Sequence, residues 1–264
     1  MLKISLLFTT LSLAACSGDK GDDSASLDSG TESTAIVFEM TFLDGMSNAP
    51  LVGAQTCIEQ PIIAGENCFV TDDDGSVEWT WGTPEKTDFL GRLSLDGYKT
   101  TLYTGRYDDD VAEIWEEEIA ETGKKNLTYF AFTEVAINLF LNTGETVQEE
   151  GQGQALIFMG TDGDSGYAGA TATFKDDAGS DVGTIQYVNP LMTGLDVTLE
   201  ATSASGGISI ANAAPGTHTL TTDSESHTCM EGFSWGSDNA GSIQVPIEAN
   251  VMTMAQMLCV MNDD

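Results

Sequence analysis

The chain has 264 residues, of which 42 are acidic and 9 are basic, so its formal net charge is −33. This length is enough for one large domain or two of ordinary size. The excess of carboxylates excludes nucleic acid and an anionic membrane surface as binding partners, because both need cationic contacts. The acidic residues are spread along the chain and indicate a solvated acidic surface on folded units.

The N-terminus has the composition of an export signal. Lys3 precedes an apolar run, Ile4–Ala14, that is too short to cross a bilayer as a helix. The run leads into Leu13-Ala14-Ala15-Cys16, which resembles a bacterial lipobox, where small residues precede a cysteine that receives diacylglycerol. The alternative is an ordinary secretory signal followed by a chance cysteine.

The lipobox resemblance implies that residues 1–15 are removed and that Cys16 becomes the lipidated N-terminus. Several acyl chains on one residue give stable membrane anchoring. Ser17, in place of aspartate, favours the outer membrane of a Gram-negative cell, with the side of that membrane left open. Residues 16–34 are rich in Ser, Gly, Asp and Thr, which predicts a disordered acidic tether.

Four cysteines remain in the exported part of the chain. An even number in an oxidising compartment indicates disulfides, with three connectivities open. Since the cysteines fall into two pairs that are local in sequence, we expect one bond in each half. Metal binding is the alternative, but there is no C-x-x-C motif and the two histidines are not spaced as ligands. The expected bonds are Cys57–Cys68 and Cys229–Cys259.

Short alternating segments dominate the first half. In Ala35–Leu43, apolar residues recur at every second position, which predicts a strand with one buried face. Val77, Trp79 and Trp81 alternate in the same way, so we expect both tryptophans in the core. Further strands are expected after Pro50, at Cys68–Val70 and at Gly91–Leu95. Two segments are helical in pattern, Val111–Glu121 and Thr133–Asn142, the second capped by Thr133 and ending near Gly144.

The second half repeats the pattern of strands and turns. The predicted strands are Ala155–Met159, Ala168–Phe174, Gly183–Val188, Gly207–Ala211, His218–Thr222, Ile243–Ala249 and Thr253–Met261. Together the halves predict a mainly β protein with two tandem β-sandwich domains, residues 35–146 and 150–264, and one or two short helices near the end of the first.

Both halves carry motifs that resemble the carboxypeptidase regulatory-like family, whose fold is the transthyretin-like (prealbumin-like) β-sandwich. The second half departs from the family because it lacks Thr-Asp-x-x-Gly. The resemblance implies an accessory domain that is structural, adhesive or carbohydrate-binding. The matching residues are Pro50, Leu51, Gly53, Ala54, Thr71, Asp72, Gly75, Gly97 and Tyr98, then Gly169, Ala170, Gly206, Ile210, Asn212, Pro215, Gly216, His218 and Leu220.

The segment FVTDDDGSVEW has two interpretations. Calcium requires six to eight convergent oxygens, and consecutive aspartates at a strand end point in alternate directions. We therefore predict that Thr71, Asp72 and Gly75 form a hairpin turn, in which Asp accepts backbone hydrogen bonds and Gly supplies a positive φ. A calcium site built from this segment and residues 108–110 or 161–164 is the alternative.

We expect no catalytic residue, no bound metal and no cofactor. The string Gly232-Phe-Ser234-Trp-Gly236 fits G-x-S-x-G, but both histidines precede Ser234 and no helical pattern follows it, as a nucleophile elbow would require. The expected role is that of a membrane-anchored surface module that is structural, adhesive or partner-binding. The alternative is a carbohydrate- or calcium-binding module, with Trp115 and Trp235 as candidates for stacking on sugar rings.

Overall fold

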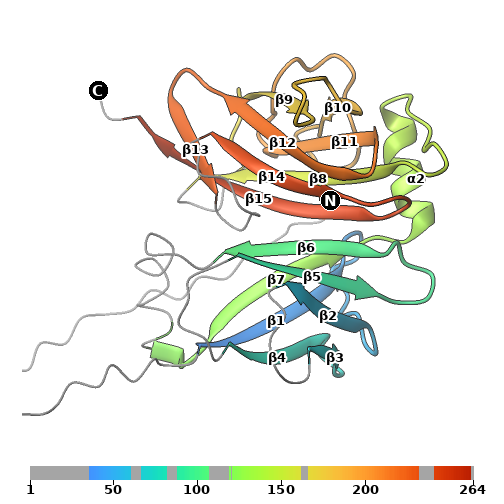
Figure 1. The fold of residues 1–264 in the computed structure, drawn as a ribbon, viewed down its shortest axis with the longest axis vertical. Coiled ribbons are helices and arrows are strands. Elements are labelled where there is room, and N and C mark those ends of the chain that lie inside the picture. The colour runs from blue at the N-terminus through green and yellow to red at the C-terminus, as the bar shows by residue number, and fades with distance from the viewer. Residues whose placement is uncertain are drawn as a thin grey trace, which may run out of the picture. The chain divides into compact units, whose positions relative to one another are not determined.

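The computed structural model describes residues 36–60, 67–81, 88–106, 119, 121–161, 166–231 and 241–262. Its described strands form three sheets, of three, nine and three strands (Figure 1). The nine-stranded sheet has the order β10-β11-β8-β15-β6-β5-β2-β3, with β13 also paired to β15. The two small sheets pack against different halves of the large one, so the chain contains two β-sandwiches, as the sequence predicts.

The first sandwich has an aromatic core. In its small sheet, β1 (Ile36–Asp44) lies antiparallel to β4 (Ser76–Trp81) and parallel to β7 (Lys125–Ala131). The alternation of β1 buries Phe38, Met40 and Phe42 completely. Trp79 is also buried, as predicted, and stacks on Phe38 with ring centroids 5.4 Å apart. Opposite lie β2 (Gln55–Gln60), β3 (Cys68–Val70), β5 (Asp88–Ser94) and β6 (Thr101–Arg106).

The second sandwich has a more aliphatic core. Its small sheet has the order β14-β12-β9 and faces β10, β11, β8, β15 and β13 of the large sheet. Ala155, Ile157 and Met159 of β8 point into this core, whereas Leu156 points to the opposite face. The bounds are β8 Gly153–Gly160, β9 Thr171–Lys175, β10 Thr184–Tyr187, β11 Gly207–Ala213, β12 Gly216–Asp223, β13 His227–Glu231, β14 Ser242–Ile247 and β15 Met252–Met261.

Helix α2 (Glu134–Thr143) covers the outer face of the large sheet. It begins where predicted, because Thr133 Oγ1 accepts a hydrogen bond from the backbone N of Ala136 at 3.1 Å, and its C-cap is Gly144. Ile137 and Leu141, four residues apart, are buried against side chains of β8, β11 and β15. No helix in the described part of the chain has the length and apolar character needed to span a bilayer.

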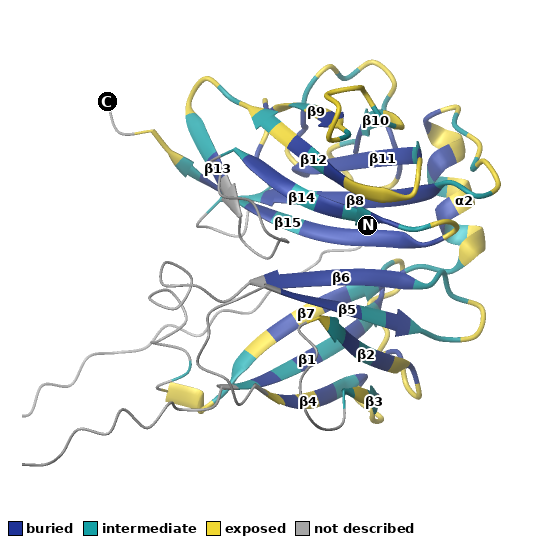
Figure 2. Cartoon of the chain, in the orientation of Figure 1, coloured by how far each residue is buried: buried dark blue, intermediate teal, exposed yellow. Residues whose placement is uncertain are grey.

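One strand joins the two sandwiches. β15 runs parallel to β8 along one edge, and Met252–Met254 pair in parallel with Thr101–Tyr103 of β6 along the other. Figure 2 shows β6 and β15 buried along most of their length. Leu90, Leu102 and Val251 form a small cluster at this junction. The large sheet is therefore continuous from one sandwich to the other, and residues Ser33–Asp264 form one compact unit.

Most predicted strands are present, and where both ends were predicted they differ by at most three residues. β6, β7 and β13 are not among the predicted strands. Residues 101–105 of β6 are all buried, because this strand lies inside the large sheet, so it has no alternating pattern that would reveal it. The segment Val111–Glu121 lies almost entirely outside the described residues. The domain limits 35–146 and 150–264 remain a prediction.

Candidate functional site

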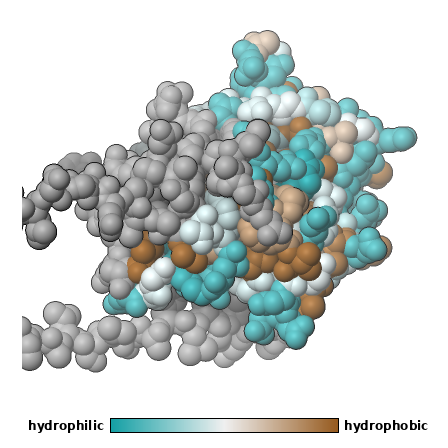
Figure 3. All heavy atoms as spheres, turned by 60° about the horizontal axis from the view of Figure 1, so that its bottom comes forward, coloured by the Kyte–Doolittle hydropathy of each residue, from teal (hydrophilic) through white to brown (hydrophobic). Residues whose placement is uncertain are grey.

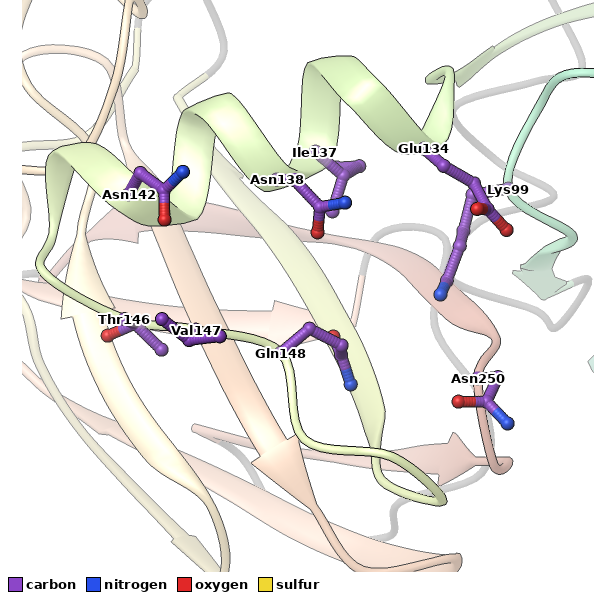
Figure 4. A pocket seen from close by; sticks show the side chains of 9 residues that line it. All are labelled: Lys99, Glu134, Ile137, Asn138, Asn142, Thr146, Val147, Gln148 and Asn250. Atoms are coloured by element: carbon purple, nitrogen blue, oxygen red, sulfur yellow. The ribbon is translucent and has the colours of Figure 1, made fainter.

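Helix α2 presents a polar stripe beside its buried face. Glu134, Asn138 and Asn142 are spaced by four residues, so their side chains lie on the same side of the helix (Figure 4). All three residues are exposed. Ile137 lies next to them at the base of a pocket. The same helix thus packs against the sheet with Ile137 and Leu141 and lines a pocket with its polar stripe.

The opposite wall is the segment after the helix, which Asn212 holds in place. Asn212 Nδ2 donates to the carbonyl of Val147 at 2.9 Å, and its Oδ1 accepts from the backbone N of Glu149 at 2.8 Å. Asn212 sits at a bulge in β11 with φ 55°. Asparagine tolerates this left-handed conformation better than most residues. Thr146 is held by a second amide, because its hydroxyl donates to Gln186 Oε1 at 2.9 Å.

Two loops from different sandwiches complete the pocket. Lys99 comes from the turn before β6, and Asn250 comes from the turn between β14 and β15. Because β6 pairs with β15, these two turns lie at the same end of the large sheet. The pocket has a volume of about 460 Å³. This lies within the range of about 300–1,000 Å³ that is usual for sites of small ligands.

The electrostatics of the pocket differ from those of the whole chain. Lys99 and Glu134 are its single cation and single anion, and their formal charges cancel. Lys99 makes no ion pair among the described residues, whereas Arg92, Lys124 and Lys175 each lie within 4 Å of a carboxylate. The pocket is thus close to neutral on a strongly acidic protein.

The lining favours binding over chemistry. Four of its nine residues carry a side-chain amide, and only Thr146 carries a hydroxyl. There is one carboxylate, so the pair of acidic groups used by glycosidases is not present among the lining residues. Gln148 Nε2 donates to the carbonyls of Glu149 and Gln152, which orients this amide with its Oε1 away from them.

Thr71, Asp72 and Gly75, the residues of the predicted turn, lie between β3 and β4. Asp72 Oδ1 accepts from the backbone N of Asp74 at 3.0 Å and of Ser76 at 2.9 Å, and Gly75 has φ 73°. Thr71 is buried, where its hydroxyl donates to the carbonyl of Leu51 and accepts from the backbone N of Ala54 at 2.9 Å. Asp72 Oδ1 is therefore engaged by the backbone of its own turn.

The second half contains an equivalent turn that motif matching misses. Asp176 Oδ1 accepts from the backbone N of Ala178 at 3.0 Å and of Ser180 at 2.8 Å, and Gly179 has φ 80°. The second half therefore differs from the pattern Thr-Asp-x-x-Gly only at its first position, where Lys175 stands in place of threonine. Residues 72–76 and 176–180 share the sequence Asp-x-x-Gly-Ser, and this shared sequence could have indicated the second turn.

Both expected disulfides are present. Cys57–Cys68 links β2 to β3, and Cys229–Cys259 links β13 to β15. In each case the two cysteines are direct partners across antiparallel strands. Each bond fastens an edge strand of the large sheet to its neighbour. This leaves no cysteine in the described residues for a metal site.

Several predicted residues lie outside the described part of the chain, namely Cys16, Trp115, Ser234 and Trp235. Of the histidines, His218 is buried with Nε2 2.8 Å from the carbonyl of Ala214, and His227 packs against the ring of Tyr167. Within the described ranges no group of three or more His, Cys, Asp or Glu side chains could hold a metal ion. Residues 108–110 and 162–164, in the remaining calcium candidates, are likewise not described.

A second surface lies at the turns of the first sandwich. Its exposed large apolar residues in the described part of the chain are Met46, Val52 and Val70. The backbone N of Gly53 donates to the carbonyl of Thr71 at 3.1 Å, which places Val52 and Val70 close together. Figure 3 turns the lower side of Figure 1 forward and shows apolar residues among hydrophilic ones. This end of the sandwich combines apolar side chains with the carboxylates of residues 72–74.

No family model matches the chain, and no curated protein matches it. Solved structures with some likeness include the TIE protein of Bacillus anthracis, with 13% identity and a TM-score of 0.27 over 86% of this chain. The chain spans 34% of the length of that protein. The shaft pilin SpaA of Lactobacillus rhamnosus GG has 10% identity and a TM-score of 0.26, with coverage of 88% and 100%. The minor pilin GBS52 of Streptococcus agalactiae has 11% identity and a TM-score of 0.27, with coverage of 87% and 98%. Likenesses at this level assign neither a family nor an activity.

Proposed function

We propose that the protein is a non-catalytic, lipid-anchored module of the bacterial cell envelope with a structural or partner-binding role. The observation that carries this proposal is the pairing of β6 with β15, which joins two sandwiches into one continuous sheet. Two disulfides fasten edge strands of the same sheet. A braced unit of this kind at the end of a flexible tether presents a rigid binding surface away from its anchor.

The chemistry of the described residues supports a binding role. The amide is the most frequent side-chain group in the lining of the pocket beside α2, which brings together residues from both sandwiches. Its single acid and single base do not form an ion pair within 4 Å, and no nucleophile activated by a histidine lies among the lining residues. Calcium binding, the other candidate role, gains no support from Asp72, whose Oδ1 already accepts two backbone hydrogen bonds.

Anchoring is tested by Cys16→Ser in a Gram-negative host. We expect the wild-type protein in the outer-membrane fraction and the variant in the soluble fraction, because only the cysteine thiol can carry the diacylglycerol. Ser17→Asp is the matched control, which keeps the lipid and is expected to change only the membrane in which the protein resides. Recovery of the Cys16→Ser protein in the membrane fraction would show that the anchor is not this cysteine.

The structural part of the proposal is tested by hydrogen exchange on the same soluble variant. If the sandwiches form one braced unit, amides of β6 and of residues 252–254 of β15 should be protected together with the cores, because opening either strand breaks the shared sheet. Fast exchange in β6 with slow exchange in β5 would mean that the sandwiches move independently in solution.

A further inference from the structure

We propose that the pocket beside α2 binds a neutral, hydroxyl-rich ligand, namely a short saccharide, and that Asn138 and Asn142 determine its specificity. This inference names the ligand class for the binding role proposed above and rests on that role. The hydrogen-bonding groups of the lining and its balanced charges point to this class of ligand.

The amides of the helix are free to bind a ligand. Asn138 and Asn142 are exposed, and their side chains have no hydrogen-bond partner among the described residues. Each amide offers two donors on its nitrogen and an acceptor on its oxygen. A sugar hydroxyl is likewise both donor and acceptor, so an amide can meet adjacent hydroxyls with either end. Four residues of helix rise by about 6 Å, so the two amides can meet neighbouring groups of one ligand.

The charges of the pocket do not select a charged ligand. Lys99 and Glu134 offset each other, and both can hydrogen-bond to a hydroxyl, the ammonium as donor and the carboxylate as acceptor. An anionic ligand would approach against the field of a chain with net charge −33. A cationic ligand would be attracted to much of the surface and gain little from this pocket. A neutral ligand therefore benefits most from the amide lining.

The composition and the rigidity of the pocket walls determine how tightly a ligand can bind. Its nine lining residues include no aromatic ring, so binding depends on hydrogen bonds and on contact with Ile137 and Val147. Asn212 and Gln186 hold the wall at residues 146–149 before any ligand arrives, which reduces the ordering cost of binding. Without stacking, we expect a dissociation constant on the order of 0.1–1 mM.

The experiment uses the full mature lipoprotein in detergent micelles and measures saturation-transfer NMR and calorimetric titration. The neutral probes are cellobiose, maltose and diacetylchitobiose, and the charged probes are galacturonic acid and glucosamine. We expect at least one neutral probe to bind, and the double variant N138A/N142A to weaken that binding about tenfold or more. Three results would overturn the proposal: no neutral probe binds, the double variant binds as well as the wild type, or a charged probe binds more tightly than every neutral one.

The matched control is V135A/L139A, which changes two exposed α2 residues outside the pocket lining. It should leave saccharide binding unchanged. Replacement of asparagine by alanine raises helix propensity, so loss of binding in N138A/N142A would not result from unfolding, and thermal melts of both variants verify this. Anchoring and hydrogen exchange are measured without a ligand. If only saccharide binding fails, the proposed structural role is unaffected. If only membrane anchoring fails, the proposed ligand of the pocket is unaffected.

Discussion

Arg92 Nη2 donates to Glu248 Oε1 at 2.7 Å and so joins β5 of the first sandwich to the end of β14 in the second. The same nitrogen donates to Glu59 Oε2 at 3.1 Å. The hydrogen bonds to Glu59 and then those to Glu248 raise the pKa of the guanidinium above its usual value. One cation thus holds two carboxylates from both halves beside the β6–β15 junction.

Removal of Arg92 should destabilise the protein more than removal of Glu248. Glu248→Gln loses one partly exposed pair and should cost up to about 1 kcal/mol of unfolding free energy. Arg92→Met leaves Glu59 and Glu248 without their shared cation and should cost about 1–3 kcal/mol. Urea denaturation at low and high salt measures both effects. Equal costs for the two substitutions would show that the pair of Arg92 with Glu59 contributes little.

Asp72 and its counterpart Asp176 should stabilise their turns to a similar extent. In each residue Oδ1 accepts two backbone hydrogen bonds. Asp72→Ala and Asp176→Ala should each cost about 1 kcal/mol of unfolding free energy. Asp73→Ala and Asp177→Ala are the matched controls, because these exposed neighbours should change stability by no more than about 0.5 kcal/mol. A loss in the controls as large as in the variants would assign the effect to net charge.

Asp44 should make stability dependent on acid pH. Burial by itself raises the pKa of Asp44, but hydrogen bonds from Ser47, Tyr98 and Met46 outweigh burial and leave the pKa below its usual value. A lowered native pKa contributes stability that is fully present above the unfolded pKa of about 3.9 and is lost as pH falls through the native value. Tyr98 Oη donates to Asp44 Oδ2 at 2.8 Å.

The check is the unfolding free energy of wild type and Asp44→Asn from pH 7 to pH 2.5. At neutral pH the variant should be less stable by about 1–2 kcal/mol, because an amide nitrogen cannot accept the hydrogen bond from Tyr98. The difference should shrink as the pH falls and Asp44 of the wild type becomes protonated. A difference that does not vary with pH would show that Asp44 is not the titrating group.

The two disulfides should differ in their contribution to stability. They link residues separated by 11 and by 30 positions in sequence. Constraint of the unfolded chain predicts roughly 3 kcal/mol for Cys57–Cys68 and roughly 4 kcal/mol for Cys229–Cys259. Chemical denaturation of the two double alanine variants, without reductant, measures the difference. A larger loss for the variant of Cys57 and Cys68 would show that strain or residual structure outweighs loop length.

Features of short range were predictable from the chain. The alternation at Phe38, Met40 and Phe42 identifies a buried strand face, because side chains alternate across a strand whatever lies opposite. Thr133 and Gly144 delimit α2 because capping depends on neighbouring backbone groups. The disulfides joined cysteines that are local in sequence because each pair lies on adjacent antiparallel strands.

The pocket could not be predicted in the same way. Asn138 and Asn142 have the pattern of ordinary exposed helix residues. Lys99 and Asn250 lie 151 positions apart, and nothing in either turn indicates that they meet. Asn212 matched a family pattern, but its hydrogen bonds to residues 147 and 149 appear only when β11 bulges beside the end of α2.

The sequence by itself determined the acidic character, the export signal pattern, the strands with clear alternation, the helix ends and the local cysteine pairs, since all depend on composition or on near neighbours. The tertiary structure alone decided that β15 pairs with both β8 and β6. The pairing of β15 with β6 depends on which strand of each sandwich has an unpaired edge. The residue pattern within β6 or β15 does not specify this pairing. The meeting of Lys99, α2 and Asn250 around one pocket follows from it.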